Sequence, residues 1–110
     1  MNISILTLTV AAAAALSANR FVTVAGAVPA ANANCLGVTR TSAAAVGDLV
    51  PVDVAGTTLV EASAAIALGA AVTTTNDGRA VTHSTGAVLA RALGAASGAG
   101  ALVEVLLIAN

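Results

Sequence analysis

The sequence predicts an all-β protein, a small β-barrel or β-sandwich of about eight short strands. Two observations predict this class: short stretches are rich in Val, Thr, Leu and Ile, and Gly, Asn, Asp or Pro separates them at close intervals. A chain of 110 residues is expected to form one domain. Because 30 residues are Ala and Phe21 is the one Phe, Tyr or Trp, the core must consist mainly of Val and Leu and must be thin.

The first element is predicted to be a strand over residues 3–10, because this segment is rich in β-branched residues and alternates in part between apolar and polar side chains. A loop of small residues, 11–15, follows it, although an Ala run also favours a short helical turn. We expect residues 1–18 to form an N-terminal arm and residues 19–110 to form the β-domain.

Residues 3–18 also have the pattern of a signal peptide, an apolar region followed by a small-residue cleavage site. The preceding Met1-Asn2 has no positively charged side chain, so a strand is the preferred interpretation. A transmembrane helix needs about 20 predominantly apolar residues, and polar side chains interrupt this segment. No membrane association is therefore expected.

In the middle of the chain, residues 48–54 are predicted to form a strand in which three Val at alternate positions share one face. Pro51 lacks an N–H, which places this strand at an edge or at a bulge. Ala55-Gly56 then offers a tight connection to residues 57–61, as in a hairpin. Residues 61–68 are the best candidate for a short helical turn, although a loop fits them equally well.

The clearest hairpin joins residues 71–75 to residues 79–82 through Asn76-Asp77-Gly78, because Asp-Gly tolerates the positive φ values of a tight turn. Residues 47–52 resemble residues 100–105, which indicates either two similar half-barrels or one strand pattern used twice. The second interpretation is preferred. Further strands are predicted over residues 20–24, 36–40 and 102–108. Residues 88–93 fit a strand or a helical turn, since Ala and Leu favour helix.

The chain carries few charges: 8% of its residues are charged, against a usual share of about 25%. The net charge is −1 and the Arg residues are scattered without a basic stripe, so nucleic-acid binding is not expected. A surface with so few charges is typical of a protein that is covered by partners. The low charge therefore predicts an obligate oligomer or an assembly subunit. The candidates for ion pairs are Arg20, Arg40, Arg79 and Arg91. Pairing within the subunit is the preferred interpretation for them, and pairing at an interface with a neighbouring chain is the alternative.

The residue types that carry site chemistry are scarce. One Cys and one His cannot build a structural zinc site, which usually takes four such ligands, and no glycine-rich phosphate loop is present, so no cofactor is expected. His83, Asp77 and nearby hydroxyl groups could be combined into a Ser/His/Asp set, but nothing in the sequence predicts the shared geometry that catalysis needs. The protein is therefore not expected to be an enzyme, and a small hydrolase using His83 is kept as an alternative.

Several segments combine strand and turn patterns that occur together in one family. They are LGVTRT at 36–41, GDLVPV at 47–52, AIALGAAV at 65–72 running into DGRAV at 77–81, and LVEVLL at 102–107. Together they resemble the small capsid cement, or head decoration, proteins of tailed bacteriophages, and the resemblance extends from about residue 3 to 108. It implies a compact β-domain that binds the outside of an assembled capsid, commonly as trimers and often with an N-terminal arm. The chain departs from the family in its many Ala and its lack of aromatic anchors.

Composition and resemblance lead to one expectation, a structural virion protein on the outer surface of a capsid that it stabilises by bridging neighbouring capsomers. The expected partners are the major capsid protein and further copies of the chain, as a homotrimer. We expect residues 2–10 to add as a strand to an exposed edge on the capsid or a neighbouring subunit. The alternative is a secreted or cell-surface β-subunit whose N-terminal signal is cleaved. The candidate contact residues are Asn2, Ile3, Ser4, Ile5, Leu6 and Thr7.

Overall fold

The computed structural model describes residues 4–108, which form eight β-strands. The predicted all-β class is confirmed, and these residues contain no helix long and apolar enough to cross a membrane. All neighbouring strands are antiparallel, in the order β2-β3-β4-β8-β7-β5-β6, with β1 paired to β4. The strands are β1 (Ser4–Ala11), β2 (Phe21–Val22), β3 (Gly37–Thr39), β4 (Leu49–Glu61), β5 (Ala71–Thr74), β6 (Ala80–Thr82), β7 (Ala90–Ala92) and β8 (Leu102–Leu107).

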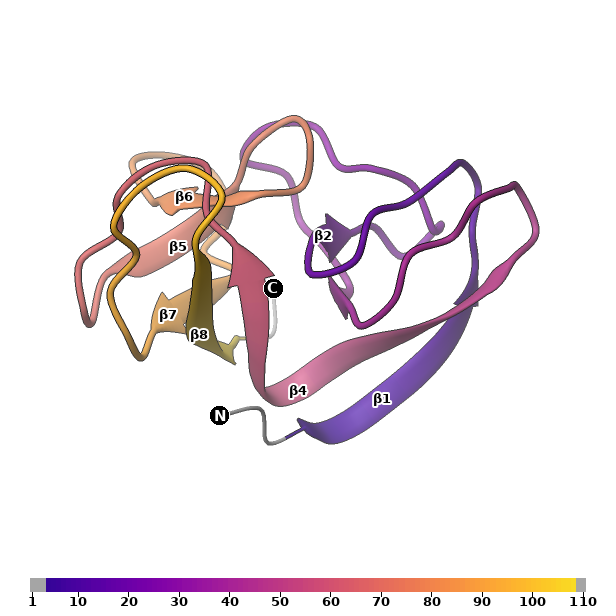
Figure 1. Cartoon of the computed structure of the whole chain (residues 1–110), viewed down its shortest axis with the longest axis horizontal. Coiled ribbons are helices and arrows are strands. Elements are labelled where there is room, and N and C mark those ends of the chain that lie inside the picture. The colour runs from indigo at the N-terminus through magenta and orange to yellow at the C-terminus, as the bar shows by residue number, and fades with distance from the viewer. Residues whose placement is uncertain (1–3, 109–110) are drawn as a thin grey trace.

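Strand β4 joins two lobes because it belongs to both (Figure 1). Its first part, residues 49–56, pairs with β1 on one side and with β3 on the other. Its second part, residues 57–61, pairs with β8. Figure 1 shows the result, a bent β4 with one group of strands at each end.

The bend in β4 lies at Gly56, whose φ of 91° is a value that glycine adopts without strain. The register of β1 against β4 shifts at the same place, opposite residues 53–56. The hairpin predicted at Ala55-Gly56 is therefore wrong. The two parts remain one strand because they pair with different neighbours, β1 and β3 before the bend and β8 after it.

Pro51 lies inside the sheet, so the prediction of an edge or a bulge is also wrong. It pairs with Thr9 of β1, and on the other side of β4 the Arg40 N–H donates to the Pro51 carbonyl oxygen at 3.0 Å. Thr39 is the last residue of β3. The missing N–H of Pro51 therefore falls where the β3 ladder ends, which makes it harmless there.

The two lobes have the same architecture. In repeat 1, residues 4–56, the pairing runs β2-β3-β4-β1, and in repeat 2, residues 57–107, it runs β5-β7-β8-β4. The register agrees as well. Val10 opposite Val50 corresponds to Val60 opposite Val103, so equivalent positions are 50 apart in the first strand (10 and 60) and 53 apart in the last (50 and 103).

The loops repeat along with the strands. Gly47 donates its N–H to the Ala12 carbonyl oxygen, and Gly100 donates to that of Ala62, both at 2.8 Å. Gly47 and Gly100 also share positive φ values of 92° and 86°. The preferred interpretation of the sequence echo, one strand pattern used twice, is therefore wrong, because the chain forms two similar half-barrels.

Residues 61–68 do not form the helical turn considered for them. The Ala62 N–H donates to the Ala101 carbonyl oxygen at 2.8 Å, and Ile66 exchanges two hydrogen bonds with Ala96. These bonds across the lobe use the backbone groups that a helical turn would pair internally. The segment is consequently extended, with a bend and a turn before β5.

Repeat 2 nearly closes into a barrel, in agreement with the predicted fold. The hairpin predicted around Asn76-Asp77-Gly78 is confirmed as β5–β6, with a φ of 83° at Gly78. At the end of β4, the Ser63 N–H donates to the Ala80 carbonyl oxygen at 2.8 Å. This contact links β4 to β6, the last strand in the order, and so closes the sheet on itself.

The core consists of two clusters of small apolar side chains. One lies in repeat 1 and includes Val22, Val50 and Val52. The larger one lies in repeat 2 and also takes in Phe21 and Val38 from repeat 1. The sheet of repeat 1 thus has one face on its own core and the opposite face on the core of repeat 2.

Candidate functional site

Strand β1 is exposed on both faces, which is unusual for a strand next to a core. The Ile5, Leu6 and Leu8 residues are 79%, 48% and 42% exposed. Thr7 donates its hydroxyl hydrogen to Asp53 at 2.9 Å, and the Ser4 hydroxyl lies 2.9 Å from that of Thr7. Four of the six candidate contact residues, 4–7, therefore lie together on β1. The other two, Asn2 and Ile3, lie outside the described residues.

The repeat shows what β1 lacks. Its counterpart in repeat 2 is the part of β4 over residues 57–61, where Thr58 and Val60 are 2% and 0% exposed. At the equivalent positions in β1, Leu8 is 42% exposed and Val10 is half-buried. Among residues 4–108, β1 thus has no layer like the one that covers its counterpart.

The outer edge of β1 is open at Thr9, whereas Gly26 lies against the Ala11 carbonyl oxygen at the end of the strand. The Ala12 N–H donates to the Asp48 carbonyl oxygen, and the Ala12 carbonyl accepts from Gly47, so both groups point toward the β4 side. Because backbone groups alternate along a strand, those of Thr9 point the other way. Within the part of the chain that the structure describes, β4 is the one strand paired with β1, and β1 carries no charged residue. Such an edge can template an added strand.

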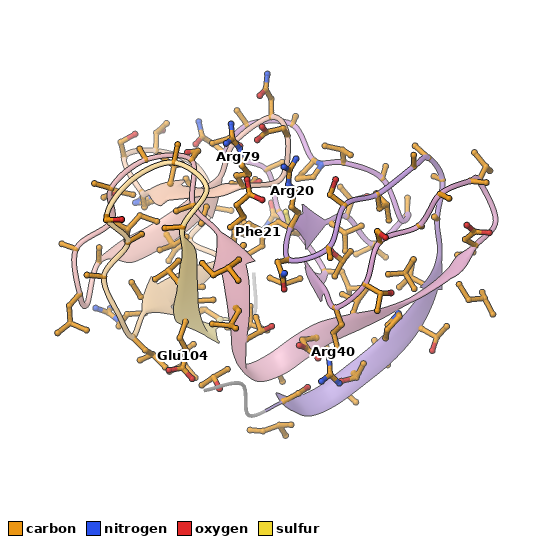
Figure 2. All side chains as sticks on the ribbon, in the orientation of Figure 1. Arg20, Phe21, Arg40, Arg79 and Glu104 are labelled. Carbon is orange, nitrogen blue, oxygen red and sulfur yellow. The ribbon has the colours of Figure 1, made fainter. Side chains whose placement is uncertain are left out.

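Arg20 and Arg79 approach one carboxylate between the two repeats, where Figure 2 shows them close together. Nη2 of Arg20 lies 3.4 Å, and Nη1 of Arg79 lies 3.7 Å, from Oε2 of Glu61. Nε of Arg79 also donates to Oδ2 of Asp77 at 2.9 Å. These two candidate residues thus form ion pairs within the subunit, which was the preferred interpretation of them.

Asp53 holds a fully buried carboxylate at the junction of the repeats. Thr7 donates to its Oδ1 at 2.9 Å and Thr58 to its Oδ2 at 2.8 Å. Nε of Arg40, a third candidate residue, lies 3.6 Å from Oδ1. A carboxylate buried this deeply requires such partners, because an unpaired buried charge is strongly destabilising.

A second apolar surface, which sequence analysis missed, lies on the outer face of β8. Leu102 and Leu106 are 49% and 43% exposed, whereas Val103 and Val105 between them are buried. Leu93 is 41% exposed and adjoins β8, since its N–H donates to the Glu104 carbonyl oxygen at 2.8 Å. Figure 2 marks Glu104 beside β8. The alternation Leu-Val-Glu-Val-Leu was the signal in the sequence, because Val103 and Val105 occupy one face and Leu102 and Leu106 lie with Glu104 on the other.

Arg91, the fourth candidate residue, lies in β7 next to this surface. It is exposed and pairs in register with Leu106. Its Nη1 donates to the Gly69 carbonyl oxygen at 3.1 Å.

The contacts of His83 and Asp77 do not combine these residues into a catalytic set. Nε2 of His83 lies 3.0 Å from the Gly86 carbonyl oxygen, while the Asp77 carboxylate binds Thr75 and Arg79. Over residues 4–108, no group of three or more His, Cys, Asp and Glu could hold a metal ion.

Cys35 lines a small pocket where repeat 1 meets repeat 2, together with Phe21 and Leu89. Burial raises the pKa of its thiol to about 12, so the thiol stays protonated near neutral pH. A protonated thiol among apolar side chains is a weak nucleophile and packs as a small hydrophobic group.

Comparison with known proteins supports one family. A sequence model of the family described as phage cement protein matches residues 2–107. Among solved structures, that of the head fiber gp8.5 N base in bacteriophage phi29 has the same fold. The TM-score is 0.77 at 24% sequence identity, over 94% of this chain and 93% of that one. Among curated proteins, no match is found.

Proposed function

Since the chain belongs to the family of phage cement proteins, we propose that it binds the outer surface of an assembled capsid and bridges neighbouring capsomers. Its role is that of a structural protein of the virion, and no catalytic step enters this proposal. The proposed partners are the major capsid protein and further copies of the chain, as a homotrimer. The secreted β-subunit finds no support, because the family match includes residues 3–18, the segment that a signal peptidase would remove.

One observation supports the binding mode, the exposure of β1 on both faces and of its outer edge at Thr9. Ile5 has 79% of its surface open to solvent, and the edge at Thr9 is unopposed among residues 4–108. An extended segment can add to the edge of a partner sheet through main-chain hydrogen bonds, with alternate side chains filling pockets. We therefore place the capsid contact on β1, with Ser4, Ile5, Leu6 and Thr7 as the described contact residues.

Binding of this kind stabilises the assembled shell by mass action, because the contact surface exists only when capsomers lie side by side. Each contact can be weak. Many copies on one shell, each spanning two capsomers, still oppose dissociation strongly because the second contact of a bound copy forms at high effective concentration.

The test is cosedimentation with empty, expanded capsids. Deleting residues 2–10 should abolish saturable binding, but this deletion also removes the partner of β4 and can unfold the protein. Two substitutions avoid that problem. Thr9→Pro removes an N–H that points away from β4, and Ile5→Asp places a charge on an exposed side chain.

Both variants should keep the thermal stability of the wild type within a few degrees and lose most of their capsid occupancy. Val24→Asp is the matched control, because Val24 is 75% exposed but lies outside β1. Full occupancy with Thr9→Pro and Ile5→Asp would overturn the role of β1. His83→Ala should leave occupancy unchanged, since His83 has no part in the proposed contact.

A further inference from the structure

The two repeats meet inside the chain through a joint that uses opposite faces of their sheets. Phe21 and Val38 belong to the sheet of repeat 1, yet they are buried in the core cluster of repeat 2 with Val60 and Val105. The outer face of one repeat thus covers the inner face of the next. This relation defines which surfaces of the chain are joined and which are left over.

A polar trio occupies this joint. Asp53 and Arg40 come from the outer face of repeat 1, and Thr58 comes from the inner face of repeat 2. The Asp53 carboxylate is fully buried between them. Within one chain, this joint covers the outer face of repeat 1 and the inner face of repeat 2. It leaves the outer face of repeat 2 and the inner side of β1 in repeat 1 uncovered.

The equivalent positions on these two remaining surfaces are all Leu. The repeat relates Arg40 to Leu93 and Asp53 to Leu106, both with a separation of 53, and relates Thr58 to Leu8 with a separation of 50. Leu93, Leu106 and Leu8 are 41%, 43% and 42% exposed. A polar trio at the closed joint is thus matched by an apolar trio at the two open ends.

We propose that copies of this chain associate head to tail, with Leu93 and Leu106 of one copy packing on Leu8 of the next. The contact repeats the geometry of the joint inside the chain and replaces the buried Asp53 and Thr58 and the half-exposed Arg40 with three apolar side chains. The occupant is a second copy because the covalent joint already shows an outer face of this sheet seated on an inner face of the same kind.

The chemistry of the surface fits this assignment. Each Leu would remove apolar area from water, the main favourable term in association. Arg91 takes the position of Val38, which is buried in the joint inside the chain. In the contact between copies the Arg91 guanidinium would therefore lie beside Leu106, where the Gly69 carbonyl oxygen already accepts its hydrogen bond.

A head-to-tail contact between identical copies closes into a ring or continues as a filament. In a ring of three copies, six repeats would follow one another, with covalent and non-covalent joints alternating. The inference rests on the self-association included in the proposed function. It uses Leu8 of β1, whereas capsid binding uses residues 4–7 and the edge at Thr9, so the two are tested by different substitutions.

The experiment is sedimentation of the full chain without capsids over a wide range of protein concentrations. The wild type should form a closed oligomer. Leu106→Asp and Leu8→Asp should each raise the dissociation constant of the joint about 30-fold or more, which is the effect of losing a hot-spot side chain. Leu68→Asp is the control, since Leu68 is 71% exposed and outside the trio.

A rescue variant tests whether Leu106→Asp acts by breaking this specific contact or only by making the surface less apolar. The triple change Leu8→Thr, Leu93→Arg and Leu106→Asp installs the trio of the covalent joint at the open ends. It should restore association that Leu106→Asp alone abolishes.

The proposal is overturned if the wild type is monomeric at every concentration, if Leu106→Asp keeps the wild-type mass, or if Leu68→Asp dissociates equally. A monomeric wild type that still cosediments with capsids would refute the joint and leave the proposed function standing. A wild-type oligomer that does not cosediment with capsids would support the joint and refute the proposed function.

Discussion

Thr58 donates its hydroxyl hydrogen to Asp53 across 2.8 Å, although the two residues are five positions apart in one strand. In a flat strand, side chains separated by an odd number of positions point to opposite faces. Here the bend at Gly56 turns the second part of β4 until both side chains meet. A local backbone conformation thereby creates the polar centre of the joint between the repeats.

Replacing Asp53 with Ala should lower the free energy of unfolding by about 3 kcal/mol, because Thr7 and Thr58 lose their acceptor in a buried site. Asp53→Asn should lose less, since an amide oxygen still accepts one hydrogen bond. Chemical denaturation measures both. Asp48→Ala is the control and should lose about 1 kcal/mol or less, because Asp48 is exposed and caps only a turn. Equal losses at the two sites would contradict this account.

Gly37→Ala should be strongly destabilising, by about 3 kcal/mol or more. A Cβ at Gly37 would lie 2.0 Å from the Asp53 carbonyl oxygen, so β3 and β4 would have to separate. Gly98→Ala is the matched control, because nothing lies within 4 Å of its Cβ position. Thermal unfolding of the two variants shows whether the loss of stability comes from the close approach of the β3 and β4 backbones or from replacing any Gly with Ala. Similar melting temperatures would refute the prediction.

The stability of the protein should fall in alkaline solution because of Cys35. Burial raises the pKa of its thiol from 9.0 to about 12, so the folded protein keeps a proton that the unfolded chain releases. The stabilisation that the protonated Cys35 thiol gives the folded state is fully present below pH 9 and is lost progressively as the pH rises from 9 toward 12. The chain has no Lys or Tyr, so no other side chain is expected to titrate there.

Denaturation midpoints of the wild type and of Cys35→Ala between pH 8 and pH 11 test this. The variant should be less stable at pH 8 and should lose the decline above about pH 9. Parallel curves would show that the thiol does not control alkaline stability.

The acid side should depend in part on Asp77. The hydrogen bond from Thr75, followed by those from Arg79, lowers the pKa of Asp77 below its ordinary 3.8. The stabilisation from this carboxylate is therefore present above pH 3.8 and is lost as the pH falls through the lower value of the folded state. Asp77→Asn should be less stable than the wild type at pH 7, by at most about 1 kcal/mol because the side chain is 40% exposed. In acid titrations of stability, the two proteins should converge once the pH falls below the lowered pKa of Asp77, and a constant difference would count against the prediction.

The strands could be predicted from the sequence where local chemistry determines them. The Asp77-Gly78 turn and the β-branched residues of β1 needed no knowledge of distant contacts. Gly56 was ambiguous, because a positive φ serves a hairpin and a strand bend equally. Only the pairing partners, β8 on one side and β1 and β3 on the other, distinguish them, and partners far apart in the sequence leave no local signal.

The candidate sites show the same limit. The arginines were recognisable by residue type, but Asp53 becomes the centre of a buried network only when Thr7, Arg40 and Thr58 converge on it. The repeat was hidden for a further reason. Equivalent positions often differ in chemistry, as Asp53 and Leu106 do, while the backbone hydrogen bonds they share depend little on side chains.

In chain order, β4 is the last strand of repeat 1 and the first strand of repeat 2, so neither repeat can unfold alone. Melting one lobe would strip a strand from the other and expose its core. A chain built from two similar units would otherwise tend to unfold in two steps, as independent repeats can. Sharing one strand couples them into a single cooperative transition, with no half-folded form in which an unpaired edge would be free to aggregate.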